Sequence, residues 1–284
     1  MISRREFLRA GSALLLSPCI ASATETAMPS LFYGHGGPPL ARDKHRAAEL
    51  FSMAQQLPSY PRGIVAFTPH VRARQVTIAS SGIARWSFPR RFVKTVGDIR
   101  YHPPLATDLG QQVLDRLAVT KIPHTNVPHK GFNHTIWMGL LHLFPQADIP
   151  VIEVAMPFLP AARLFEFGQA LASLRQAGIL IVSSGTVTHN LGSFGHAGEP
   201  PVWAREYDQW AFETIAKNDI DAVIDWRNRA PAANIAHPDD GAHFNVMMFA
   251  LGAAVGRSGG LDQSRTMHEG YEFGTFSNRG FLFG

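Results

Sequence analysis

The sequence is almost devoid of cysteine. The one cysteine among its 284 residues, Cys19, lies in an N-terminal segment that we expect to be removed, so the mature chain would have none. A chain without cysteine forms no disulfide and offers no thiolate for catalysis. It also cannot hold zinc or an iron–sulfur cluster through sulfur. These kinds of chemistry are therefore excluded for the mature protein.

Charge is sparse as well. Asp, Glu, Lys and Arg make up 17% of the chain, the formal net charge is +4, and no run of five or six basic residues occurs. This pattern argues against a disordered or coiled-coil protein and against nucleic acid as a partner. No segment offers roughly 18 uninterrupted apolar residues, so we expect no stable insertion in a membrane. Apolar residues reach 45%, which is enough for a full core.

The N-terminus has the features of a targeting segment. Ser3-Arg4-Arg5-Glu6-Phe7-Leu8 resembles the twin-arginine export signal, an apolar run follows from Ala10 to Ile20, and Ala21-Ser22-Ala23 fits a cleavage site for a signal peptidase. We expect residues 1–28 to be a signal peptide read by the twin-arginine export machinery, residues 29–284 to form one domain, and the mature protein to be periplasmic. The alternative is a short amphipathic anchor helix.

Apolar strand-like runs alternate with helical patterns along the chain, which predicts βαβ units. We expect an α/β fold, a single domain with a central mixed, largely parallel sheet flanked by helices. The strands are expected at 30–34, 62–68, 74–79, 121–126, 150–155 and 179–184, with a final strand at 271–277. The helices are expected at 42–56, 105–118, 133–144, 161–177, 201–217 and 239–255.

Histidines follow three of the expected strands. His35 ends the run that begins at Leu31, His70 follows Thr68-Pro69, and His189 lies just beyond the run from Ile179 to Ser184. We expect Pro69 to end its strand. In an open α/β sheet the ligand crevice lies beyond the carboxyl ends of the strands. Neutral imidazole is the commonest metal ligand, so the three histidines predict a site for a divalent metal ion.

Two more histidines belong to predicted helix starts. Asn133 is a good N-cap, which places His134 in the first turn of the next helix. The positive end of a helix disfavours the imidazolium ion, so a neutral His134 could accept a proton as a general base. His243 lies near the start of an apolar helix, where it either reaches the site or is a satisfied core residue.

Several segments together resemble the class III extradiol ring-cleavage dioxygenases, in particular the branch that includes the DOPA 4,5-dioxygenases. The matching segments are Gly34-His35-Gly36, the strand ending at His70, Gly131-Phe132-Asn133-His134 with Trp137, Ala147-Asp148-Ile149-Pro150, Gly185 with His189-Asn190-Leu191, and His243 with Leu251-Gly252-Ala253. Their order and separations make the resemblance specific, and it extends over nearly the whole mature chain.

The resemblance implies roles for these histidines. His35, His70 and His189 would bind one divalent metal ion, Zn(II) or Fe(II), and His243 would be a further ligand or an acid/base residue. His134 would be the acid/base group of catalysis. The substrate would be a small aromatic diol, a DOPA-like catechol, which is cleaved with incorporation of both atoms of O2.

Two other functions remain open at this point. The first is a zinc-dependent hydrolase, which would need a carboxylate base such as Glu153 or one of the pair Asp239-Asp240. The second is a non-catalytic periplasmic metal-binding protein. A deep pocket roofed by aromatic residues, for which we expect Trp86, Phe88, Tyr101 and Trp137, would argue against a simple metal carrier.

Overall fold

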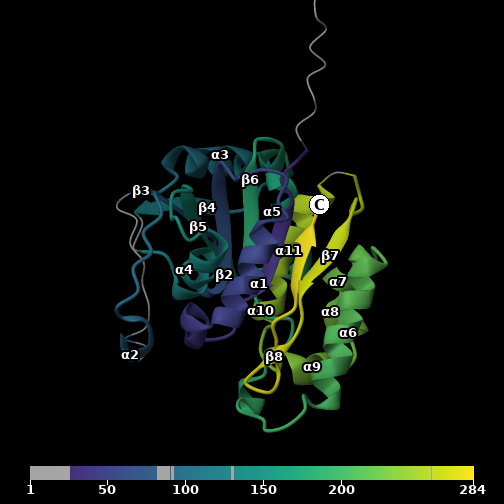
Figure 1. The fold of residues 1–284 in the computed structure, drawn as a ribbon. Coiled ribbons are helices and arrows are strands. Elements are labelled where there is room, and N and C mark those ends of the chain that lie inside the picture. The colour runs from purple at the N-terminus through teal and green to yellow at the C-terminus, as the bar shows by residue number, and fades with distance from the viewer. Residues whose placement is uncertain (1–25, 82–89, 91–92, 129–130, 257) are drawn as a thin grey trace, which may run out of the picture.

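The fold is given by a computed structural model, which describes residues 26–81, 90, 93–128, 131–256 and 258–284. The predicted signal peptide at 1–28 falls almost entirely outside these residues, as do Trp86 and Phe88. At the centre lies an eight-stranded sheet in the order β4-β3-β5-β2-β6-β1-β10-β7 (Figure 1). The predicted α/β class is confirmed.

The sheet is mixed around a parallel centre. Strands β5, β2, β6 and β1 are parallel to one another, β10 and β3 run antiparallel to their neighbours in this centre, and β4 is parallel to β3. The strands of the main sheet are β1 (Ser30–Gly34), β2 (Gly63–Ala73), β3 (Val76–Ser81), β4 (His124–Pro128), β5 (Val151–Pro157), β6 (Ile179–Gly185), β7 (Ser264–His268) and β10 (Gly280–Phe283). A separate small hairpin pairs β8 (Tyr271–Glu272) with β9 (Phe276–Ser277).

Helices cover both faces of the sheet. The longer ones are α1 (Lys44–Ala54), α3 (Thr107–Ala118), α4 (His134–Leu143), α5 (Ala161–Gln176), α6 (Val202–Ala216) and α11 (Met247–Val255). The shorter ones are η1 (Pro38–Arg42), α2 (Val93–Val96), η3 (Leu191–Ser193), α7 (Ile220–Ile224), α8 (Trp226–Arg229), α9 (Ala233–Ala236) and α10 (Ala242–Asn245). The apolar residues of α1 and α4 pack in one core cluster and those of α3, α5, α6 and α11 in another.

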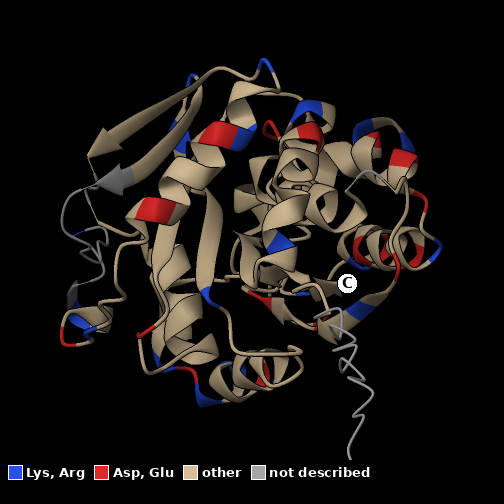
Figure 2. Cartoon of the chain, turned by 90° about the horizontal axis from the view of Figure 1, so that it is seen from above, with Lys and Arg blue, Asp and Glu red and all other residues tan. Residues whose placement is uncertain are grey.

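The central strands explain this arrangement. Along β2, Ile64 and Ala66 belong to the cluster with α4, whereas Val65 and Phe67 belong to the cluster with α5 and α11. Successive side chains of a strand point to opposite faces, so a strand that is apolar throughout is covered on both sides. Charged residues therefore gather on the outer helices and connections (Figure 2). No helix within the described residues is long and apolar enough to cross a bilayer.

Three expectations about the elements were wrong. Strand β2 does not end at Pro69 but continues to Ala73. The strand can contain Pro69 because its pairing with β5 is interrupted between Thr68 and Arg72, so that the missing N–H of proline is not needed there. The predicted last strand over 271–277 is instead the hairpin of β8 and β9. The helix expected at 239–255 begins only at Ala242 and is divided into α10 and α11 at Val246.

Candidate metal centre

The predicted site residues meet at the carboxyl ends of β1, β2 and β6. A cavity of about 440 Å³ lies there, and His35, His70, His134, His189 and His243 all line it. Segments that are far apart in the sequence therefore contribute to one site, as expected for the switch region of an open α/β sheet.

His35 is held in place by its backbone and by one hydroxyl group. Its N–H donates to the carbonyl of Gly185 at 2.9 Å, and the next residue, Gly36, has φ +52, a conformation that glycine adopts readily. The Oγ of Ser184 lies 3.0 Å from His35 Nδ1 and donates its own proton to the carbonyl of Thr135. Since the single O–H of serine is used there, Ser184 accepts from Nδ1–H. The Nε2 atom of His35 is then left with its lone pair facing the cavity.

His70 is presented by a bulge in β2. In the pairing with β5, Thr68 is opposite Ala155 and Arg72 is opposite Met156, so three residues of β2 have no counterpart in β5. Pro69 and His70 belong to this unpaired stretch. Bulges often redirect a side chain next to a functional site, and here His70 is the exposed residue that reaches the other histidines.

The nitrogens of three histidines have the spacing of a metal site. His70 Nε2 lies 3.3 Å from His35 Nε2 and 3.2 Å from His243 Nε2. The ligand atoms of these three residues all lie within 4.8 Å of one another. Two nitrogens bound at ~2.0–2.1 Å to one tetrahedral cation would be ~3.3 Å apart. The donor set and its spacing therefore fit a divalent metal ion.

His243 reaches this cluster from α10. Its carbonyl accepts a hydrogen bond from the N–H of Thr186 at 3.1 Å, which fixes α10 against the end of β6. Gly185 makes this approach possible, because a Cβ atom at that position would lie 2.2 Å from the carbonyl oxygen of His243. Glycine at position 185 thus lets His243 approach the other histidines.

His189 lies beside this trio. Its ring stacks on that of His243 with 3.5 Å between the centroids, and its Nδ1 is 3.8 Å from Asp239 Oδ2. With Asp239 and His243 it forms a second group that could hold a cation. The interaction with His189 lowers the pKa of Asp239 to about 2. The structure brings His189 to the site, and its role as a ligand stays a prediction.

Burial lowers the pKa of two of the clustered imidazoles, His35 and His243. His35 is only 2% exposed, and this burial, together with the neighbouring histidines, holds its pKa well below the ordinary value. The pKa of His243 is also well below its ordinary value. Burial is the main cause, and the nearby rings of His189, His35 and His70 add to it. Only the neutral imidazole can bind a metal, so both residues are in the binding form at neutral pH.

His134 is the first residue of α4, as predicted, and its ring centroid lies 5.3 Å from that of His70. Asn133 caps the helix by accepting from the N–H of Thr135 at 3.1 Å. The backbone N–H of Asn133 in turn donates to Glu153 at 2.8 Å. Glu153, a carboxylate only 5% exposed on the central strand β5, therefore anchors the segment that carries His134.

None of the carboxylates considered for hydrolysis is among the described residues that line the histidine cavity. Glu153 does not line the histidine cavity, and Asp240 pairs with Arg72. Asp239 lies beside His189 and shares a possible cation-binding group with His189 and His243, but it does not line the cavity either. The cavity wall therefore offers no described carboxylate that favours a hydrolase.

Aromatic residues do line the cavity, although the two expected ones within the described residues, Tyr101 and Trp137, are not among them. Tyr101 and Trp137 are core residues, since both are almost fully buried and belong to the cluster around α4. The aromatic wall is made instead by Phe194, which follows η3, and by Phe273 and Phe276 of the β8–β9 hairpin. These phenylalanines follow no helix or strand periodicity in the sequence, so their position in the cavity wall could not be predicted from it. Thr95 of α2 also lines the cavity.

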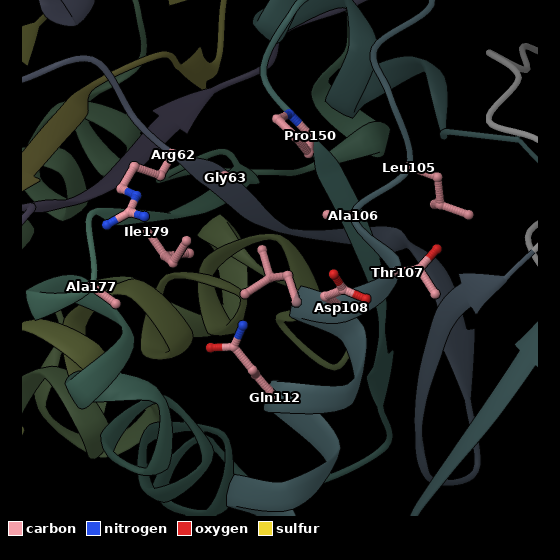
Figure 3. A pocket seen from close by; sticks show the side chains of 11 residues that line it. Arg62, Gly63, Leu105, Ala106, Thr107, Asp108, Gln112, Pro150, Ala177 and Ile179 are labelled. Carbon is pink, nitrogen blue, oxygen red and sulfur yellow. The ribbon is translucent and has the colours of Figure 1, made fainter.

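A second cavity, of about 460 Å³, lies at the opposite end of the sheet. Gly63 and Ile179, the first residues of β2 and β6, border it, and Arg62, Asp108 and Gln112 are part of its wall (Figure 3). It contains no histidine and lies at the amino ends of the parallel strands, where open α/β sheets do not bind their ligands. The histidine cavity at the carboxyl ends of the strands is therefore the candidate site.

Comparison with known proteins agrees with this site. The family model of the catalytic LigB subunit of aromatic ring-opening dioxygenases matches residues 41–276. The chain belongs to this family. It is thus an extradiol dioxygenase, an oxidoreductase, and the resemblance found in the sequence is confirmed. Metal dependence and the use of O2 are general to LigB-family enzymes, and the histidine group described above could bind such a metal.

Individual relatives cover most of this LigB-family chain. The 4,5-DOPA dioxygenase extradiol of Beta vulgaris is 27% identical, over 89% of this chain and 96% of its own length. The protein of the same name from Escherichia coli (strain K12) is 29% identical, over 89% and 94%. The crystal structure of an uncharacterized protein from Escherichia coli K12 superposes with a TM-score of 0.75, at 26% identity, over 90% of this chain and all of that chain.

Proposed function

We propose that this protein cleaves the ring of a catechol-type substrate at a single metal ion held by His35, His70 and His243, with His189 as a further ligand or neighbour. The observation that supports this most directly is the spacing of 3.2 and 3.3 Å between their Nε2 atoms, in a cavity with an aromatic wall. Three histidines on one side of a metal leave positions open for substrate and O2 on the other. The names of the relatives are consistent with a DOPA-like diol.

The protein's own residues would supply orientation and proton transfer. Phe194, Phe273 and Phe276 offer a surface on which an aromatic ring can stack. His134, in the first turn of α4 and next to His70, would accept a proton from one hydroxyl of the diol. Bound Fe(II) would supply Lewis acidity and a route for electrons to O2, whereas Zn(II), which has no redox chemistry, would supply only the Lewis acidity.

In the overall reaction both atoms of O2 enter the product and the ring bond beside the diol breaks, which gives a semialdehyde acid. The test is to remove the metal, reload the protein anaerobically with Fe(II) or Zn(II), and then admit oxygen in the presence of catechol. We expect the Fe(II) form to consume O2 in step with a yellow product, and the Zn(II) form to do neither. An Fe(II)-loaded protein that binds catechol but leaves its ring intact would refute the proposal.

We also propose export to the periplasm through the twin-arginine route. The support comes from the sequence alone, from the paired Arg4-Arg5 and the apolar run after them. Substituting both arginines by lysine should keep the protein in the cytoplasm, as measured by fractionation of cells that express the full chain. If the double variant still reaches the periplasm, this route is wrong.

A further inference from the structure

The cavity has room and an apolar surface beyond the metal ligands. Besides the histidines, its wall includes Leu191, Phe194, Phe273 and Phe276. Phe194 and Phe273 stack with their centroids 4.5 Å apart, and Phe276 meets both rings, at 5.9 and 5.7 Å. Phe276 also lies 4.8 Å from the ring of His189, so this cluster begins directly at the histidines.

The outer part of this wall is exposed. Phe194 is 57% and Leu191 is 66% accessible, whereas Phe276, at the base of the cluster, is buried. Exposed large apolar side chains beside a polar site mark a surface that binds an apolar group. A diol bound by its oxygens at the histidines would direct its ring, and whatever the ring carries, toward this surface.

No charged partner for a substituent is found on the described part of the wall. Among the described residues that line the cavity, the histidines are the only titratable ones. Arg72, two residues after His70, pairs with Asp240, and Arg42, which donates to the carbonyl of Thr95, pairs with Asp98. The nearby carboxylate of Glu272 accepts from the N–H of Gly37 at 3.1 Å. A carboxylate group placed against the phenylalanines would lose water without gaining a partner among the described wall residues.

We infer that the preferred substrate of this site is a catechol whose ring carries an uncharged, apolar alkyl or aryl substituent, which packs against Phe194, Phe273 and Leu191. This inference rests on the proposed ring cleavage and adds the chemical class of the substrate. It distinguishes this protein from an enzyme selective for DOPA, whose side chain carries both an ammonium and a carboxylate group.

The test compares substrates that differ only in the substituent. With the Fe(II)-loaded full chain, kcat/KM is measured for catechol, 4-methylcatechol and 4-propylcatechol, and for DOPA and 3-(3,4-dihydroxyphenyl)propionate. We expect kcat/KM to rise up to about fourfold for each methylene that becomes buried. The propionate, which matches the propyl compound in carbon number, and DOPA should be at least about tenfold poorer because their charges must be desolvated.

Variants locate the effect. Phe194→Ala should lower kcat/KM for 4-propylcatechol several-fold more than for catechol itself. Phe51→Ala, which truncates an exposed phenylalanine of α1 outside the cavity wall, should leave the ratio between the two substrates unchanged. Equal or better use of DOPA than of 4-propylcatechol would overturn the inference, as would an equal effect of Phe194→Ala on both substrates.

Failure of the inference can be told apart from failure of the proposed function. Cleavage of unsubstituted catechol reports on the function, and the ratio between substituents reports on the inference. If no ring is cleaved, calorimetric affinities of the Zn(II)-loaded protein for 4-propylcatechol and DOPA still give that ratio. Tighter binding of DOPA would then refute the preference.

Discussion

The Oε2 atom of Glu153 accepts a 2.8 Å hydrogen bond from the backbone N–H of Asn133, the residue that caps α4. The carboxylate faces the positive end of the helix, which favours its charged form. Burial has the larger effect and raises the pKa of Glu153 to about 7. The other oxygen, Oε1, is buried and has no hydrogen-bond partner among the described residues. Glu153 is thus a carboxyl group that titrates close to neutral pH behind the segment carrying His134.

This relationship predicts a pH-dependent loss of stability. Because the folded state binds the proton of Glu153 more tightly than the unfolded state does, the stabilisation is present at low pH and is lost as pH rises through about 7. Between pH 5 and pH 8 the free energy of unfolding of the wild type, relative to Glu153→Gln, should fall by about 2–3 kcal/mol. Denaturant unfolding of both proteins at each pH measures this difference.

The comparison with Glu153→Gln cancels the opposite contribution of the buried histidines, whose lowered pKa values favour the folded state as pH rises. Glu166→Gln is a matched control, since Glu166 is an exposed carboxylate that pairs with Arg163. The prediction fails if wild type and Glu153→Gln have parallel stability curves over this range.

Ser184 predicts a second effect, on metal affinity. Its hydroxyl fixes the proton of His35 on Nδ1, and removal of such a partner of a ligand typically weakens metal binding 10- to 100-fold. We expect that loss for Ser184→Ala, measured by competition with a chelator. The neighbouring Ser183→Ala should have no such effect, because the Oγ of Ser183 is buried without a hydrogen-bond partner. Equal affinities of the two variants would contradict the role of Ser184.

The four histidines of the proposed metal site can be ranked by the effect of their substitution on metal affinity. His35→Ala, His70→Ala and His243→Ala each remove one of the three clustered nitrogens and should reduce metal affinity by more than the 10- to 100-fold typical of a residue that only supports a ligand. His189→Ala tests the remaining predicted ligand. If His189→Ala loses as much metal affinity as His70→Ala, His189 is a full ligand. If it loses less, His189 only supports a ligand. Metal content after dialysis measures all four, with the exposed His45→Gln as control. If His70→Ala retained its metal in full, the cluster of His35, His70 and His243 would not be the metal site.

His134 should affect catalysis and not metal binding. A general base contributes typically 10²- to 10⁴-fold to the rate, so His134→Gln should lower kcat by a factor in this range while the metal content stays at the wild-type level. Steady-state assays of the Fe(II)-loaded variant, together with metal analysis of the same sample, check both parts. Full activity of the variant would exclude His134 as the base.

The parallel centre of the fold and the site histidines could be predicted because both depend on local patterns. The apolar runs of β1 and β6 are long and continuous, and a histidine at or after such a strand must lie near the crevice. The continuation of β2 past Pro69 could not be predicted, because it depends on a bulge formed against β5. Tyr101 and Trp137 were misplaced since the sequence does not say which side of a loop or helix faces the core.

The C-terminal elements were harder to predict from the sequence, because their positions also depend on contacts between distant segments. Strand β10 is a short apolar run that occupies an interior position only because β1 and β7 are available on either side. The aromatic wall follows from the same long-range assembly, since Phe194 and Phe273 come from segments about 80 residues apart that meet in space. Neither of these two segments has a sequence pattern that predicts the contact.

The pairing of β1 with β10 also sets the order of events during synthesis. Among the described strands of the main sheet, β1 is the first in chain order and its neighbour β10 is the last. His243 and the β8–β9 hairpin also come late in this order. One edge of β1 therefore stays unpaired until β10 has been synthesised, and His243 can join His35 and His70 only after most of the fold has been made.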